Sequence, residues 1–302
     1  MKVSAKITHG ILRLFGRLPL GFHYANSRFL AWLIGDVIRY RRDVVSFNLA
    51  RCFPELNTKE LKALRKESYR HFAEIVVEAV WFGACRNQER LRKSRIVSVA
   101  NPEVLADMYA KSPSVAVLYS HCGNWELYGG MVNYNYTENP SPATEKNFVV
   151  VYKKTNSEST DEVMRANRFA PLEDRDGFDG YVETKDLVRY AFRHKDDKKI
   201  YNINTDQRPY KSSGANIPVK FLGQDTSTMT GAAAIARKFG MAVCYLRSER
   251  QSQGHYVLEY VPICEDASQT GVEEIMAKYY ELLEADIRKQ PANYLWTHKR
   301  FK

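Results

Sequence analysis

The sequence predicts an α/β fold in which helices flank a largely parallel β-sheet, preceded by an α-helical, membrane-associated amino-terminal region. Two observations support this prediction. After residue 100, short apolar runs alternate with stretches of helical periodicity, whereas residues 1–100 show helical spacing of their apolar positions. We therefore expect two parts, a helical region over residues 1–100 and an α/β domain over residues 101–302.

The amino-terminal region is the part for which we expect contact with a membrane. Residues 7–38 are rich in Ile, Leu, Phe and Trp, but polar and charged side chains interrupt them, so a run of about 20 apolar residues that could span a bilayer does not occur. No small-residue site closes an apolar core, so a cleavable signal peptide is not expected. We expect one or two amphipathic helices in the membrane interface, with Arg13, Arg17 and residues 39–42 near anionic headgroups. The alternative is that these helices only cap the soluble core.

The elements follow from periodicity and from turn residues. Apolar positions at helical spacing predict a long helix that is capped at residues 58–60 and runs to Trp81. Later β-branched and apolar runs predict strands, and the stretches around them predict helices. The expected strands are residues 115–119, 148–152, 200–203, 217–221, 242–246 and 256–261, and the expected helices are residues 102–110, 125–133, 158–169, 183–194, 228–239 and 271–289.

Charge and cysteine content restrict the function classes. A net charge of +10 favours anionic partners, namely nucleic acid, acidic lipid headgroups or an acidic carrier protein. The basic residues do not form one block, and no zinc-finger or RNA-binding motif is present, so nucleic-acid binding is not expected. Five scattered cysteines favour a reducing compartment over a disulfide framework. No CxxC, HExxH, Walker or Rossmann motif is present, so we expect neither a metal nor a nucleotide bound in those ways.

The candidate catalytic residues lie in residues 120–126, SHCGNWE, directly after the apolar run VAVLY. An imidazole that is held by a carboxylate can take a proton from an alcohol. Side chains five residues apart would lie roughly 140° apart on one helix, so we expect His121 in the loop and Glu126 in the first turn of the next helix. Gly123 and Asn124 are the residue types that such a reversal needs. From the pattern alone, a solvated or packed histidine remains the alternative.

The spacing of His121 and Glu126 is similar to the H-x4-D/E block of the lysophospholipid acyltransferase superfamily. More specifically, the chain resembles the lipid A biosynthesis late acyltransferase family from about residue 48 to its end. Five further blocks occur in the order of that family: residues 48–55 (NLARCFPE), residues 149–154 (VVVYKK), residues 205–207 (TDQ), residues 219–223 with 228–231 (VKFLG and TMTG), and residues 291–301 (PANYLWTHKRF).

The resemblance implies a layered acyltransferase fold at the cytoplasmic face of the cell inner membrane. It also implies direct transfer of a fatty acyl chain from the thioester of an acyl carrier protein to a hydroxyl of a lipid A precursor, without a cofactor. His121 would be the general base, and Glu126 would fix its tautomer. The substrate-binding residues that the resemblance implies are Asn124, Trp125, Lys153, Asp206, Gln207 and Arg208.

Two residues depart from the family pattern. Cys122 replaces an aromatic or bulky apolar residue, and Lys153 replaces the commoner arginine, which can grip a phosphate with two hydrogen bonds. We therefore expect the acceptor pocket to differ from that of other members. Backbone amides near Gly123 and Asn124 are the candidate donors to the negative charge that develops on the thioester carbonyl. A nucleophilic Cys122 is the less favoured alternative, because direct attack needs no covalent intermediate.

Two other functions remain open from the sequence. The first is acyl transfer to lysophosphatidic acid or to an amino-acid-containing lipid, although the F-P-E-G block of the glycerolipid branch is missing after the second predicted strand. The second is a basic peripheral membrane protein without catalysis, which the amphipathic amino terminus and the positive net charge would support.

Overall fold

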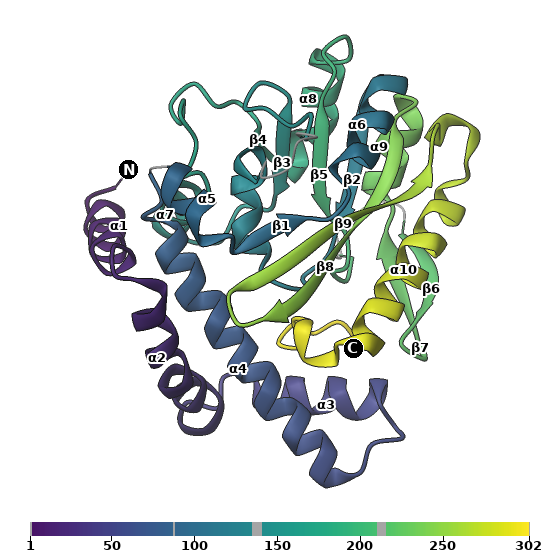
Figure 1. The fold of residues 1–302 in the computed structure, drawn as a ribbon. Coiled ribbons are helices and arrows are strands. Elements are labelled where there is room, and N and C mark those ends of the chain that lie inside the picture. Colours follow the sequence, from purple (N-terminus) through teal and green to yellow (C-terminus); the bar gives the residue numbers. More distant parts are fainter. Residues whose placement is uncertain (1, 87, 135–140, 210–215, 302) are drawn as a thin grey trace.

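The computed structural model describes residues 2–86, 88–134, 141–209 and 216–301, and within them helices cover both faces of a seven-stranded sheet (Figure 1). The strand order is β1-β9-β8-β2-β5-β3-β4, and every neighbouring pair is parallel except β8 with β9. The predicted α/β class with a largely parallel sheet is therefore confirmed. The strands are β1 (Val97–Val99), β2 (Val115–Tyr119), β3 (Phe148–Tyr152), β4 (Tyr181–Glu183), β5 (Ile200–Asn204), β8 (Ala242–Ser252) and β9 (His255–Cys264).

Strands β2 and β3 have continuous apolar sequences, as expected of strands that are buried on both faces of a sheet. Every residue of β2 is buried, and its side chains alternate between two cores: Ala116 and Leu118 join one, Val115 and Val117 the other. The first core also contains residues of α9 (Gly231–Lys238) and α10 (Val272–Lys289), and the second contains residues of α6 (Pro102–Lys111) and η2 (Trp125–Asn133).

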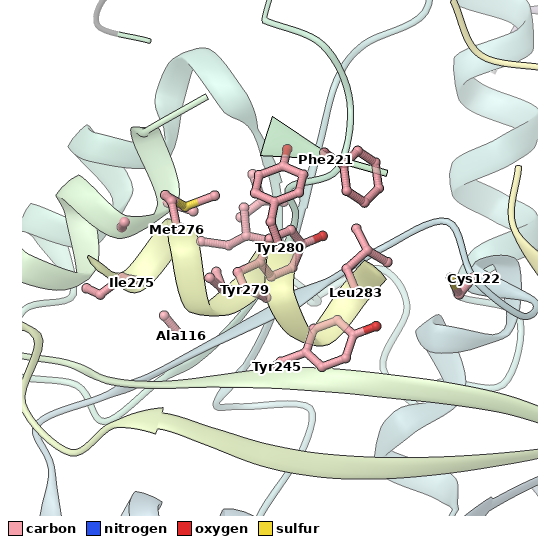
Figure 2. Packing of buried hydrophobic residues seen from close by; sticks show 14 of the residues in the cluster. Ala116, Cys122, Phe221, Tyr245, Ile275, Met276, Tyr279, Tyr280 and Leu283 are labelled. Carbon is pink, nitrogen blue, oxygen red and sulfur yellow. The ribbon is translucent and has the colours of Figure 1, made fainter. Parts of the chain in front are cut away.

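Helix α10 closes the first core with the apolar stripe that its sequence predicts. Figure 2 shows Ile275, Met276, Tyr279 and Leu283 of α10 among the side chains of this core. Two buried hydroxyls also find partners, because Tyr245 donates to Asp286 on this helix and Tyr279 donates to the carbonyl of Tyr119 at the end of β2. The helix therefore fixes the position at which β2 ends.

The remaining elements include α7, η3 and α8, which lie near the edge of the sheet where β2, β3 and β5 end. Strands β6 and β7 form a separate antiparallel hairpin beside α10 (Figure 1). The remaining elements are α7 (Glu158–Arg168), η3 (Thr184–Asp186), α8 (Leu187–Arg193), β6 (Asn216–Phe221), β7 (Gln224–Met229), η4 (Ala267–Gln269) and η5 (Pro291–Asn293).

The amino-terminal region is helical up to residue 94, as predicted, and then supplies edge strand β1 of the sheet. Helix α1 packs against α4 and α7, and α2 packs against α4, so both lie along the outside of the molecule (Figure 1). The long helix is capped one residue earlier than predicted, because the Asn57 side chain and Glu60 form a reciprocal capping box. The elements are α1 (Val3–Gly16), α2 (Leu20–Trp32), the π-helical turn η1 (Leu33–Val37), α3 (Arg42–Cys52), α4 (Thr58–Phe82) and α5 (Gln88–Ser94).

Within the described part of the chain, no helix combines the length and the apolar character that crossing a membrane requires. The predicted division of the chain at residue 100 stays a prediction, although β1 ties the residues just before it to the same sheet as the residues after it.

Candidate active site

The candidate site lies where three neighbouring parallel strands, β2, β3 and β5, end at the same edge of the sheet. This edge is where α/β sheets bind ligands. A cavity of about 680 Å³ opens there between the strand ends, η2, α8 and α9. Its wall is mainly apolar, formed among others by Val150, Val151, Phe169, Leu187, Ile203, Met229, Ala232 and Ile235, and it also carries the basic side chains Lys153, Lys154, Arg168 and Lys238.

The loop after β2 has a backbone that only glycine allows at one position. Gly123 has a φ of +65°, and a Cβ atom there would approach the Ser248 Oγ to 2.1 Å. The carboxyl-terminal segment holds the loop on both sides of this glycine: the Gly123 N–H donates to the Asn293 carbonyl at 3.0 Å, and the Leu295 N–H donates to the His121 carbonyl at 3.1 Å. His121 therefore sits on a fixed loop at the end of β2, as the sequence predicts.

The carboxylate that holds the imidazole belongs to Asp206, which follows β5. The His121 Nδ1 and the Asp206 Oδ1 lie 2.8 Å apart, and the other Asp206 oxygen accepts the His121 backbone N–H at 3.3 Å. Burial alone would raise the pKa of this carboxyl, but the neighbouring imidazole and its two hydrogen bonds, with a contribution from His298, hold the pKa below its ordinary value. An ionised Asp206 accepts the Nδ1 proton, so the network leaves Nε2 as the basic nitrogen.

Two side chains surround the basic nitrogen of His121 at the cavity wall. The Gln207 Nε2 lies 3.2 Å from the His121 Nε2, so the Gln207 amide can donate to the lone pair that a substrate hydroxyl would use. The Trp125 ring packs edge-on against the imidazole, with centroids 4.8 Å apart and planes at 72°. The imidazole side chain is 13% exposed, whereas that of Asp206 is 2% exposed. His121 can therefore meet a ligand in the cavity while its carboxylate partner stays behind it.

The predicted hydrogen bond between Glu126 and His121 does not occur among the described residues, and this prediction needs correction. Glu126 lies in the first turn of η2 as expected, but its two carboxylate oxygens accept two hydrogen bonds of 2.7 Å from the guanidinium of Arg168, and one of them also accepts the Trp125 indole N–H at 3.0 Å. Burial opposes the charge of Glu126, yet the Arg168 charge and these hydrogen bonds lower its pKa. The physical reason for the correction is that a planar guanidinium satisfies both oxygens at once, which an imidazole cannot do.

Some of the other residues that were predicted to bind substrate line the cavity, and others do not. Trp125, Lys153 and Gln207 line the cavity. Partial burial lowers the pKa of Lys153. Arg208 is exposed and is not among the residues that line the cavity.

The Asn124 side chain is placed differently from the prediction that it binds substrate. It is 1% exposed and lies beneath the loop, where its Oδ1 accepts the Glu126 N–H and its Nδ2 donates to Glu78. The Gly123 N–H, predicted as a donor to the reacting carbonyl, is already bonded to the Asn293 carbonyl. The Asn124 side chain and the Gly123 N–H therefore both stabilise the conformation of the loop.

The cysteine after the histidine is placed unfavourably for nucleophilic chemistry. Cys122 is 2% exposed, and burial raises the pKa of its thiol well above its ordinary value. In the residues that the structure describes, no group of three or more His, Cys, Asp or Glu side chains could hold a metal ion.

Arg168 is the residue at this site that sequence reasoning missed. It ends α7, where a basic side chain is ordinary because it complements the helix dipole. Its 42-residue separation from Glu126 gives no local signal. The pairing of His121 with Asp206, 85 residues apart, was equally hidden, because it depends on β2 and β5 being neighbours in the sheet.

Comparison with known proteins finds a family whose model covers nearly the whole chain. A family model described as bacterial lipid A biosynthesis acyltransferase matches residues 4–302. The "Lipid A biosynthesis palmitoleoyltransferase" of Escherichia coli (strain K12) is 23% identical over 301 residues, which cover 97% of this chain and 89% of the relative. The "Lipid A biosynthesis acyltransferase" of Shigella flexneri has the same identity and coverage. The "Lipid A biosynthesis lauroyltransferase" of Escherichia coli (strain K12) is 24% identical over 309 residues, with 97% and 89% covered.

Proposed function

Because the chain belongs to the bacterial lipid A biosynthesis acyltransferase family, and is thus an acyltransferase, we propose the donor, the acceptor and the residues of its reaction. The enzyme transfers a fatty acyl chain from the thioester of an acyl carrier protein to a hydroxyl of a lipid A precursor. The observation that carries this proposal is the 2.8 Å contact between His121 and Asp206 at the wall of an apolar cavity. A base next to an apolar cavity is what deprotonation of an alcohol beside a bound acyl chain requires.

The proposed reaction is a direct attack. The His121 Nε2 takes the proton of the acceptor hydroxyl as its oxygen forms a bond to the thioester carbon. The carbon–sulfur bond then breaks, and the imidazolium returns the proton to the leaving thiolate, so the products are an ester and a free carrier thiol. Asp206 stabilises the imidazolium and keeps Nδ1 protonated, which is the role of the acid in Ser-His-acid sites. The incoming hydroxyl replaces the Gln207 amide at Nε2.

Glu126 acts in this scheme through Arg168. The carboxylate fixes the guanidinium with two hydrogen bonds, and Arg168 lines the cavity as a cation that cannot lose its charge. We assign to Arg168 the stabilisation of negative charge that develops on the thioester carbonyl, in place of the Gly123 amide. Trp125, Lys153 and Gln207 bind substrate from the cavity wall, with Lys153 directed to a phosphate of the acceptor or of the carrier's phosphopantetheine. Asp206 orients the base, and Arg208 belongs to the surface outside the cavity.

The proposed location is the cytoplasmic face of the inner membrane, and the exposed side chains of the first two helices support it. Val3, Ile7, Ile11, Leu14 and Phe15 of α1 are each at least half exposed. Phe22, Phe29 and Trp32 extend the exposed apolar surface along α2. Such a surface next to basic residues fits an anionic bilayer, with the helices lying in the interface.

Acyl transfer from a labelled acyl carrier thioester to a panel of acceptors tests the proposal. The panel holds a lipid A precursor, lysophosphatidic acid and an amino-acid-containing lipid, and His121→Ala is measured beside the wild type. We expect transfer to the lipid A precursor by the wild type and its loss in His121→Ala, with Cys122→Ala retaining activity as a control on the same loop.

Each other outcome contradicts a stated part of the proposal. Transfer only to another acceptor would keep the mechanism and reject the lipid A precursor as the substrate. An active His121→Ala variant would reject the proposed base. A folded wild type that transfers to no acceptor and binds vesicles as the variant does would favour the non-catalytic membrane protein.

A further inference from the structure

Glu78 is a buried carboxylate that the proposed reaction does not use. It lies on α4, is 0% exposed, and accepts hydrogen bonds from Tyr24 of α2 at 2.9 Å, from Asn124 at 2.8 Å and from Tyr256 of β9 at 2.9 Å. All three donors are neutral, and no ion pair of Glu78 occurs within the described residues. The nearby cation Arg250 forms an ion pair with Glu74 instead.

This arrangement is costly for the fold. Burial raises the pKa of Glu78 to about 7, although the three hydrogen bonds oppose the shift. Burying a carboxyl group without a cation is unfavourable, and an apolar side chain in the same place would avoid that cost. A group of this kind in a native structure calls for a reason beyond stability.

The contacts suggest that this reason is to hold the loop between His121 and Glu126. The Asn124 Nδ2 donates to Glu78, and the Asn124 Oδ1 accepts the Glu126 N–H at 3.1 Å and so caps η2. Only one orientation of the amide makes both bonds. Glu78 thereby fixes the residue that stands between His121 and Glu126.

We propose that Glu78 is a positioning residue for acyl transfer, which holds the loop of His121 and the start of η2 in place through Asn124. This inference rests on the proposed role of His121. Neither Glu78 nor Asn124 lines the cavity, so both act on the reaction only through the side chains that they position.

The first test removes the hydrogen bond between Asn124 and Glu78 while keeping the cap of η2. In Asn124→Ser the hydroxyl can still accept the Glu126 N–H, because serine is a good cap, but the side chain is too short to reach Glu78. A shift of about 1 Å at reacting groups can cost about 100-fold in rate. We expect kcat to fall at least tenfold, with an unchanged KM for the acyl carrier thioester and a folded protein by circular dichroism. A loss of binding alone, or no loss, would overturn the inference.

A reciprocal exchange gives a second, independent variant. Asn124→Asp places a carboxylate against Glu78, and we expect it to lower kcat at least tenfold. In the double variant Asn124→Asp/Glu78→Gln the glutamine amide donates to the aspartate, so the bond is remade in reverse and kcat should return to within about threefold of the wild type. A double variant that is as slow as Asn124→Asp would overturn the inference.

Two controls separate this inference from the proposed function. Tyr24→Phe removes a hydrogen bond to Glu78 without touching Asn124, so its kcat should stay within about threefold of the wild type. The wild type and His121→Ala are measured in the same assay. An active His121→Ala would refute the proposed function, whereas an inactive His121→Ala beside an unimpaired Asn124→Ser would refute only the role of Glu78.

Discussion

At the scale of single residues, two carboxylates divide the work at the candidate site. Asp206 contacts both the ring and the backbone N–H of His121, and Glu126 contacts Arg168. Asp206 is buried and Glu126 is partly buried, and in each the pKa is lowered despite the loss of solvation because of a specific partner. Perturbed groups that gather at a cavity are typical of catalytic sites.

The ion pair of Glu126 and Arg168 leads to a stability prediction. Arg168→Met leaves the Glu126 carboxylate without its cation, and we expect a loss of about 3 kcal/mol in the free energy of unfolding. The double variant Arg168→Met/Glu126→Leu removes both charges and should recover most of that loss. Urea unfolding measures both values. A double variant as unstable as the single one would show that the pair is not the cause.

The raised pKa of Glu78 predicts how stability depends on pH. Between its ordinary value of 4.5 and about 7, the folded protein binds more protons at Glu78 than the unfolded chain, so this group lowers stability as pH rises through that window. Glu78→Gln lacks this titration. Its free energy of unfolding relative to the wild type should therefore rise from pH 5 to pH 7.5, by about 2 kcal/mol. A difference that stays constant with pH would contradict the assignment.

At the scale of elements, long strands and helices were predictable, whereas short or polar ones were not. The apolar sequence of β2 and the helical stripe of α10 both indicate burial, and both elements occur where they were expected. Strands β1 and β4 have three residues each, too few for a period to show. Strand β7 (QDTSTM) was not predicted, and its last two residues fall in the helix expected over residues 228–239, which begins only at Gly231. Hairpin pairing with β6, rather than an apolar pattern, makes β7 a strand.

The predicted site shows the same division. His121 and its loop follow from local signals, namely a strand end, a glycine and a motif. The partners of His121 and Glu126 depend on strand order and on where α7 ends, and one sequence contains neither. The family resemblance indicated Asp206 and Gln207 as site residues, but not that Asp206 holds the imidazole.

The exposed face of α1 leads to a prediction about membrane binding. Ile7 and Ile11 are 59% and 52% exposed, so Ile7→Ser/Ile11→Ser should leave the unfolding midpoint unchanged and lower binding to anionic vesicles at least tenfold. Phe192→Ser on α8, where the side chain is 63% exposed, is the matched control and should bind like the wild type. Equal binding by the two variants would contradict the proposed role of α1.

At the scale of the whole molecule, the positive charge favours an acidic carrier. The net charge of +10 should attract such a carrier over a distance that salt shortens. We expect raised ionic strength to depress the transfer rate at low carrier concentration, with little effect at saturation. The measurement is the initial rate against carrier concentration at two salt concentrations, and a flat response would count against an acidic protein donor.

The molecule as a whole combines a sheet edge that collects the reactive groups with helices that support them from outside. Segments from β2, β5, α7 and the carboxyl terminus meet at His121 and its neighbours. The central claim is that His121 is the base and that Asp206 orients it.

The rate of acyl transfer by Asp206→Asn tests that claim most directly. An asparagine offers one acceptor oxygen where two N–H groups of His121 now donate, so either the ring or the backbone loses its partner. We predict that kcat falls at least 100-fold, with an unchanged KM for the acyl carrier thioester and a folded protein. A folded Asp206→Asn variant within threefold of the wild-type kcat would contradict the account.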